Sequence, residues 1–306
     1  MARRKRGTDV HGWLVVDKPV GPSSAAVVAT ARRALDARKA GHAGTLDPLA
    51  SGVLAVAFGE ATKTVPYAQD GAKTYRFTVR LGQATETDDA EGAVVATSDR
   101  RPDAAAIVEA LAAFEGETLQ VPPVYSAVKI GGRRAYDLAR AAAEGTADLP
   151  DLAARPLTVH AIALLARPDP DHAEIEMTCG KGGYVRSVAR DLGRMLGCHG
   201  HVAALRRVAA GPFGLAHAIS FDELATMTQE TAHARLLPVA TGLDDIPALA
   251  VPAADADRLR RGQAIAPTAT AAPPDGASAW AALDGVPVAI GRHRGGAFHP
   301  DRVFNL

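Results

Sequence analysis

The stretch Lys39-Ala-Gly-His-Ala-Gly-Thr-Leu-Asp-Pro-Leu-Ala-Ser-Gly52 is the densest local signal in this chain of 306 residues. Its glycines permit tight turns and close approach of the backbone, and Pro48 biases Asp47 towards an extended conformation. We expect a tight loop, neither helix nor strand, that holds one carboxylate in a fixed position. From the residues alone, a structural turn with a capping aspartate is the alternative.

The sequence on either side of this loop alternates between strand and helix patterns. Short apolar or alternating runs predict strands at residues 13–17, 53–58, 74–81, 157–167 and 173–179. Capping residues and helical spacing predict helices at residues 23–35, 102–114, 135–144 and 184–196. Because the elements follow no strict βαβ repeat, we expect the α+β class with a mixed, largely antiparallel sheet.

A domain boundary is expected soon after Pro238. Beyond it come short apolar runs broken by glycine and proline, and a low-complexity loop at residues 266–278. The sequence therefore predicts one domain over residues 1–243 and a small β-rich domain over residues 244–306.

Composition favours an ordinary globular protein, with 47% hydrophobic and 22% charged residues. The apolar runs are shorter than the roughly 20 residues that span a bilayer, and no signal peptide is visible. The two cysteines are too few for a secreted disulfide scaffold. These features predict a cytoplasmic protein without membrane contact.

The charges are unevenly distributed, although the formal net charge is zero. Residues 1–76 hold 12 Lys and Arg against 6 Asp and Glu, and residues 179–211 hold 6 against 1. Folding could unite the two segments into one basic face suited to nucleic acid. Two separate solvated surfaces are the alternative.

Six separated motifs resemble, in order and spacing, those of the tRNA pseudouridine synthase B family, also called tRNA pseudouridine-55 synthase. The resemblance covers about residues 11–225, and residues beyond about 240 resemble a PUA-type RNA-binding module only loosely. The motifs are Leu14–Pro19 with Gly21 and Ser23-Ser24, the loop 39–52, Lys73–Arg76 with Arg80–Gln83 and Thr87–Gly92, Tyr125–Lys129, Cys179–Arg186, and Asp191–Gly193 with Leu205–Arg207.

The resemblance implies a pseudouridine synthase fold and isomerisation of the T-loop uridine of tRNA after it has been flipped out of the folded RNA. The N1–C1′ bond breaks, the base turns and C5 joins the same sugar carbon. This isomerisation is redox-neutral, so no cofactor and no metal are expected. The expected partner is the T arm of tRNA, and the protein is expected to act as a monomer without an obligate protein partner.

The resemblance also assigns roles to individual residues. Asp47 is the expected catalytic carboxylate, as nucleophile or base, and Arg186 the arginine that holds it, in a network with Asp89. Tyr75 is expected to stack on the target base, and Leu205 to form an apolar wall. The expected RNA-binding residues are Lys18 (a phosphate or loop contact), His42 (filling the space of flipped nucleotides), Tyr184 (a pocket aromatic), and Lys129 and Arg133 in a mobile segment, 120–150, that grips the T arm.

Each assignment has a plainer alternative. Without the resemblance, Arg186 reads as a solvated residue at a helix start, Asp89 as part of an acidic turn, Tyr75 as a core aromatic and His42 as a loop histidine. At the level of the whole chain, the alternatives are a non-catalytic tRNA-binding or tRNA-folding protein and a synthase that acts within a guide-RNA complex. A zinc site at Cys198-His199-Gly200-His201 with Cys179 lacks a second ligand pair at the usual spacing, so buried cysteines are favoured.

Overall fold

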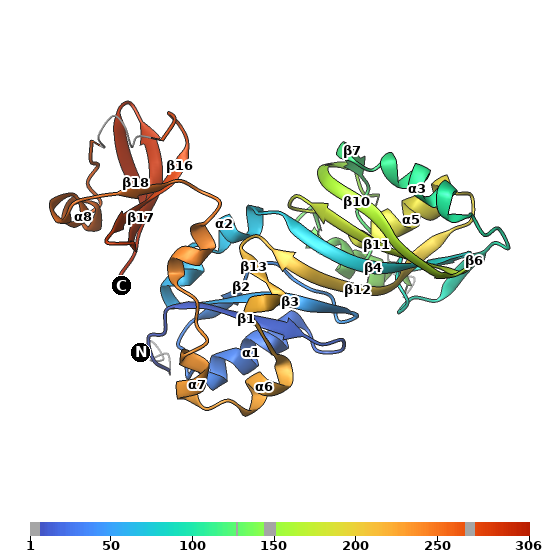
Figure 1. The fold of residues 1–306 in the computed structure, drawn as a ribbon, viewed down its shortest axis with the longest axis horizontal. Coiled ribbons are helices and arrows are strands. Elements are labelled where there is room, and N and C mark those ends of the chain that lie inside the picture. Colours follow the sequence, from blue (N-terminus) through green and yellow to red (C-terminus); the bar gives the residue numbers. More distant parts are fainter. Residues whose placement is uncertain (1–6, 127, 144–150, 267–272) are drawn as a thin grey trace. The chain divides into compact units, whose positions relative to one another are not determined.

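The computed structural model describes residues 7–126, 128–143, 151–266 and 273–306 (Figure 1). The chain divides into two compact units. The first comprises Met1–Pro48, Gly52–Gly71 and Ala209–Leu306, and the second comprises Leu49–Ser51 and Ala72–Val208. Within the described ranges, no helix has the length and apolar character needed to cross a membrane.

Two buried strands, β1 (Gly12–Lys18) and β3 (Ala50–Phe58), organise the first unit. They pair antiparallel, with Trp13 opposite Ala57. Nearly every residue of both strands is buried, which is why their sequences are almost continuously apolar. Strand β14 (Ala218–Ser220) adds to β1 in parallel, and β2 (Ala40–His42) adds to β3 antiparallel.

Helices and short strands complete this part of the first unit. The indole of Trp13 packs on Phe213 with 4.7 Å between ring centroids, at the centre of the unit's buried cluster. Helix α1 lies next to β1 and α6. The bounds are α1 Ser24–Ala34, η1 Gly59–Lys63, α2 Val65–Asp70, β13 Phe213–Gly214, η2 Leu215–His217, α6 Phe221–Thr226, α7 Gln229–His233 and η3 Val239–Leu243.

The last part of the chain builds a sheet of its own in the order β15-β16-β17-β18. The pair β15–β16 is parallel and the other pairs are antiparallel. A separate buried cluster that includes Leu259, Ala281 and Phe298 joins this sheet to helix α8. The bounds are β15 Ala248–Ala250, α8 Ala253–Arg260, β16 Ser278–Leu283, β17 Val286–Arg294 and β18 Ala297–Val303.

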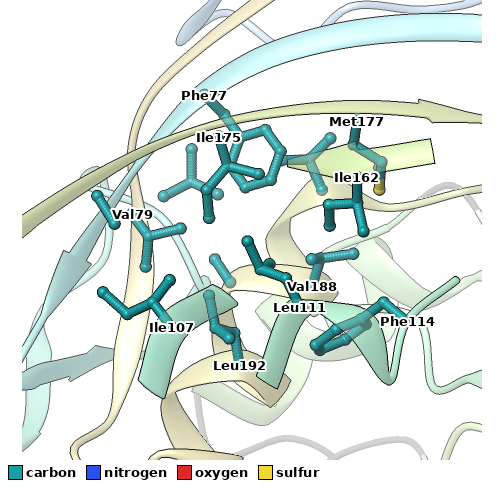
Figure 2. Close-up of a cluster of buried hydrophobic side chains, with 14 of the residues drawn as sticks. Phe77, Val79, Ile107, Leu111, Phe114, Ile162, Ile175, Met177, Val188 and Leu192 are labelled. Atoms are coloured by element: carbon teal, nitrogen blue, oxygen red, sulfur yellow. The ribbon is translucent and has the colours of Figure 1, made fainter. Parts of the chain in front are cut away.

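The second unit is a sheet in the order β12-β4-β11-β10-β7 with helices α3 and α5 on one face. Figure 2 shows the cluster between these layers, where Phe77 and Val79 of β4 meet Leu111 of α3 and Val188 of α5. The bounds are β4 Lys73–Leu81, α3 Ala104–Ala112, β7 Gly116–Gln120, β10 Arg155–Asp169, β11 His172–Cys179, α5 Val185–Met195 and β12 Gly200–Ala210.

Two further hairpins extend from the second unit. Strands β5 (Gln83–Thr85) and β6 (Val94–Thr97) form the first, with the acidic turn between them. Strands β8 (Lys129–Ile130) and β9 (Arg133–Arg134) form the second and lead into α4 (Ala135–Ala143).

The predicted fold class is confirmed, because the strand pairs in both units are mostly antiparallel with parallel additions. All five predicted strands and all four predicted helices are present with small changes in their ends. The predicted end of α4, Glu144, and the core of the low-complexity loop lie outside the described residues. The division at residue 243 and the mobility of segment 120–150 stay predictions.

One local prediction was wrong. Residues 40–42 of the expected loop form a strand, β2, because their backbone pairs with β3 at Ala57 and its neighbours. The irregular loop is therefore shorter than expected, running from Ala43 to Leu49. Strand β12 was not predicted at all.

We predict that Gly193→Ala lowers the free energy of unfolding by about 2 kcal/mol, because a Cβ at Gly193 would lie 2.2 Å from the backbone nitrogen of Gly200. The gain in helix propensity of up to ~1 kcal/mol cannot offset a clash with backbone. Urea denaturation measures the change. Gly180→Ala is the control, since its new Cβ would meet nothing closer than 3.7 Å, and a change confined to about ±0.5 kcal/mol is expected. Equal stability of the two variants would contradict the prediction.

Candidate active site

The backbone on the N-terminal side of Asp47 is fixed by the Ser24 hydroxyl. Ser24 Oγ accepts from the Leu46 amide and donates to the Leu46 carbonyl, both at 2.8 Å. Ser24 is 3% exposed, so these bonds are shielded from water. The neighbouring Ser23 caps α1 by accepting from the Ala26 amide. The two serines thus have separate roles, one in the helix and one in the loop.

The backbone on the other side of Asp47 is held at Pro48. The Gly21 amide donates to the Pro48 carbonyl at 2.8 Å. Lys18 Nζ donates to the same carbonyl at 3.3 Å and to the Pro19 carbonyl at 2.8 Å. Lys18 is fully buried and contacts the loop, and its expected phosphate contact stays a prediction. Residues 18–24 therefore clamp the loop on both sides of the half-buried Asp47.

Arg186 lies in the first turn of α5 and is only 7% exposed. Its Nη1 lies 3.4 Å from Oδ2 of Asp89 and donates to the Thr87 carbonyl at 3.2 Å. Its Nη2 donates to the Tyr125 carbonyl at 2.9 Å. The solvated helix-start alternative is therefore wrong, because this guanidinium is buried among oxygen acceptors.

Asp89 is the partner carboxylate and is 2% exposed. Its Oδ1 accepts from the Thr87 hydroxyl at 2.5 Å and from the Glu91 amide at 3.0 Å. The Thr85 hydroxyl holds its backbone carbonyl at 2.6 Å. The expected pairing of Asp89 with Arg186 is present in the structure, and the carboxylate is oriented by its own turn.

Tyr75 and Leu205 border the buried cluster of the second unit. Both are half-buried and pack against it, Tyr75 from β4 and Leu205 from β12. Leu49, which follows Asp47 by two residues in the chain, belongs to the same cluster. Ser51 donates to the Leu205 carbonyl at 3.5 Å. Tyr75 thus packs against the core, as the plainer interpretation of a core aromatic expects, but it is only half-buried.

Besides Lys18, the expected RNA-binding residues occupy three different places. His42 ends β2 and is half-buried. Tyr184 precedes α5, where its backbone exchanges two hydrogen bonds with the Gln120 side chain. Lys129 and Arg133 are exposed on either side of the tip of the β8–β9 hairpin, a position suited to phosphate contacts.

The sequence reasoning missed Arg190 and Asp88. Arg190 Nη1 lies 3.2 Å from Oδ2 of Asp88, the residue before Asp89. The sequence contained a signal for this pair. Asp88 and Asp89 are adjacent, and Arg186 and Arg190 are four residues apart on one predicted helix, a spacing that places both arginines on the same face.

The cysteines are buried and free, as expected. Burial raises the pKa of the Cys179 thiol to about 11 and raises that of Cys198 as well. His201 Nδ1 is engaged with the Gln83 carbonyl at 3.0 Å. Among the residues that the structure describes, no group of three or more His, Cys, Asp or Glu side chains could hold a metal ion.

The arrangement supplies a single carboxylate on a clamped loop in the first unit. In the second unit it supplies the buried pair of Arg186 and Asp89 and the half-buried ring of Tyr75. An oriented carboxylate can act as nucleophile or as base. A buried arginine can engage an anion through a planar fork of donors.

Comparison with known proteins gives a consistent result. Residues 32–185 match the family described as "TruB family pseudouridylate synthase (N terminal domain)", and residues 186–244 match "tRNA pseudouridylate synthase B C-terminal domain". The chain is 57% identical to tRNA pseudouridine synthase B of Cereibacter sphaeroides, over 100% of both chains. It is 55% identical to the protein of the same name from Dinoroseobacter shibae, over 99% of this chain and 98% of the relative.

Solved structures share the fold. The structure titled "Crystal Structure of a Cbf5-Nop10-Gar1 Complex" aligns with a TM-score of 0.75 at 25% identity, over 96% of this chain and 85% of that one. A second, an H/ACA RNP bound to a substrate RNA containing 2′-deoxyuridine, aligns with a TM-score of 0.75 at 22% identity, over 100% of this chain and 92% of that one.

We predict that Ser24→Ala speeds amide hydrogen exchange at Leu46 and lowers the free energy of unfolding by about 1–3 kcal/mol, because it leaves a buried amide and carbonyl without their partner. Ser23→Ala is the matched control, since it removes the exposed α1 cap at a cost of about 1 kcal/mol and does not touch the loop. Hydrogen exchange followed by mass spectrometry separates the two. Equal protection of Leu46 in both variants would show that Ser24 does not hold the loop.

Proposed function

The chain belongs to the TruB family of pseudouridylate synthases, and we propose that it isomerises the T-loop uridine at position 55 of tRNA to pseudouridine. Relatives named tRNA pseudouridine synthase B, at 55–57% identity over nearly the whole of both chains, support the tRNA substrate. The solved structures of the Cbf5-Nop10-Gar1 complex and of the H/ACA RNP are only 25% and 22% identical to this chain, so they lend less support to the alternative of a synthase within a guide-RNA complex.

The observation that carries the proposal is the clamp around Asp47. A carboxylate that reacts with a sugar carbon, or removes its proton, must be positioned before substrate arrives, because orientation provides much of the rate. Ser24 fixes the residue before Asp47, and Lys18 with Gly21 fixes the residue after it. Backbone hydrogen bonds on both sides of one half-buried carboxylate suit a catalytic group, which must be held in a fixed position.

In the proposed reaction, Asp47 acts on the ribose of the flipped uridine, as nucleophile at C1′ or as base. The N1–C1′ bond breaks, and C5 of the turned base bonds to the same carbon. C5 then loses its proton and N1 gains one, so the composition of the nucleotide is unchanged. We propose that Arg186, already paired with Asp89, donates hydrogen bonds to Asp47 and orients its carboxylate. We propose that Tyr75 stacks on the flipped base.

The same proposal assigns RNA contacts to the exposed hairpin. Lys129 and Arg133 would position the T arm by binding phosphates, without reading sequence. Tyr184 would line the pocket, with Leu205 as its apolar wall, and His42 would fill the space left by flipped nucleotides. Residues 244–306 would form a PUA-like RNA-binding domain; the family match ends at residue 244, and the β15–β18 sheet has its own buried cluster.

We propose that the protein works as a monomer in the cytoplasm, with neither cofactor nor obligate protein partner. The isomerisation moves no electrons to or from the substrate, so its chemistry requires only positioned acids, bases and hydrogen-bond donors.

The direct test is to incubate the pure protein with unmodified tRNA transcript and to map pseudouridine in T-loop fragments by mass spectrometry after chemical tagging, since the isomerisation leaves the mass unchanged. Pseudouridine at position 55 supports the proposal. Tight tRNA binding without pseudouridine would establish the non-catalytic alternative instead.

We predict that Asp47→Asn lowers the single-turnover rate at saturating tRNA at least a hundredfold, or ~2.7 kcal/mol, because it removes the reacting charge with almost no change in volume. The melting temperature and tRNA affinity should stay close to those of the wild type. Asp36→Asn is the control: Asp36 is exposed and has φ +44°, which asparagine tolerates, so its rate should be unchanged. A rate above about a tenth of wild type for Asp47→Asn would remove Asp47 from the mechanism.

We predict that Arg186→Lys lowers the same rate at least a hundredfold although it keeps the positive charge. Lysine offers a compact ammonium that cannot reach Asp89, the Thr87 carbonyl and the Tyr125 carbonyl together. Arg194→Lys is the control on the same helix, because the Arg194 side chain is 67% exposed. A normal melt with a near-normal rate for Arg186→Lys would defeat the proposed role.

A further inference from the structure

Arg190, one helical turn after Arg186, joins three parts of the second unit. Its Nε and Nη2 bind the two carboxylate oxygens of Asp191 at 2.9 and 3.1 Å. Its Nη1 pairs with Asp88 at 3.2 Å, and Nη2 also donates to the Val121 carbonyl at 2.8 Å. The Arg190 side chain is 11% exposed and the Asp88 side chain 16%, so water screens these contacts only weakly.

Asp88 connects Arg190 to the arginine–aspartate pair of the candidate active site. It directly precedes Asp89, and its backbone lies in the left-handed region, with φ +61°. Its carbonyl accepts from the Val202 amide at 3.0 Å. Burial raises the pKa of the Asp88 carboxyl, against the opposing effect of the Arg190 and Arg186 guanidinium groups. The two acids of this turn therefore engage two successive turns of α5.

Val121 connects Arg190 to the segment that carries the exposed hairpin. Val121 directly follows β7, and its carbonyl accepts from both Arg190 and the hydroxyl of the fully buried Ser187. Four residues later, the Tyr125 carbonyl accepts from Arg186. The start of the segment is thus held at two points by neighbouring turns of one helix.

We infer that Arg190 is a positioning residue that sets the geometry of Arg186 by tying both Asp88 and Val121 to helix α5. Arg186 touches the Asp89 turn and the Tyr125 carbonyl, and Arg190 fixes the residue next to that turn and the start of that segment. This inference rests on the proposed function for its substrate.

The test compares single-turnover rates at saturating tRNA for Arg190→Met in two backgrounds, the wild type and Arg186→Lys. In the wild-type background we expect a loss of at least about tenfold, or ~1.4 kcal/mol. In the Arg186→Lys background we expect less than a threefold further loss, because a residue that acts through Arg186 has nothing left to position. A purely structural role would lower the rate by the same factor in both backgrounds.

Arg194→Met is the matched control, since Arg194 is on the same helix and contacts the same Asp191, at 3.4 Å, while its side chain is 67% exposed. In each background, its rate should stay within twofold of the rate of the parent protein without the Arg194 substitution. A loss below tenfold for Arg190→Met, or a threefold or larger further loss with Arg186→Lys, would overturn the inference.

Removal of Arg190 leaves Asp88 without its cation and could unfold the protein. In that case Ser187→Ala decides, because it removes only the second hydrogen bond on the Val121 carbonyl. We then expect at least a threefold loss in the wild type and no further loss with Arg186→Lys; any other pattern overturns the inference. Wild-type protein that binds tRNA but forms no pseudouridine would instead contradict the proposed function.

Discussion

A buried guanidinium group needs protein oxygen atoms to accept the hydrogen bonds that it would otherwise donate to water. Arg186 is buried, so the second unit must supply these acceptors. The acceptors come from Asp89, Thr87 and Tyr125, which lie far from Arg186 in sequence. The β5–β6 turn, the start of the hairpin segment and helix α5 must therefore assemble together. The sheet and its buried cluster provide the apolar surface that makes this assembly stable.

Local patterns were sufficient for most of the fold. Strands β1 and β3 are buried on both faces, so their apolar runs stand out, and β4 shows a clear alternation. Strand β12 was missed because its burial follows no regular alternation and its sequence includes two adjacent arginines, Arg206 and the buried Arg207. Strand β2 was missed because three residues carry too little pattern, and only its pairing with β3 makes it a strand.

Site residues that belong to recognisable motifs could be predicted from the sequence. Contacts between residues far apart in the chain could not. The loop around Asp47 and the pairing of Arg186 with Asp89 followed from the motifs and the family they resemble. The double hydrogen bond of Ser24 to Leu46 joins residues 22 positions apart, and the sequence identified Ser24 only as part of the first motif. Arg190 read as one of several helix arginines, because its partners come from two distant segments.

The left-handed backbone of Asp88 restricts what evolution can place at that position. Glycine would relax the backbone but would leave Arg190 without its carboxylate, and glutamate would keep the charge on a residue that resists φ +61°. Asparagine would suit the backbone while losing the ion pair. Two independent demands, one conformational and one electrostatic, thus converge on the same amino acid. Replacement of Asp88 should consequently be accompanied by replacement of Arg190, so that these two positions covary within any lineage that retains this turn.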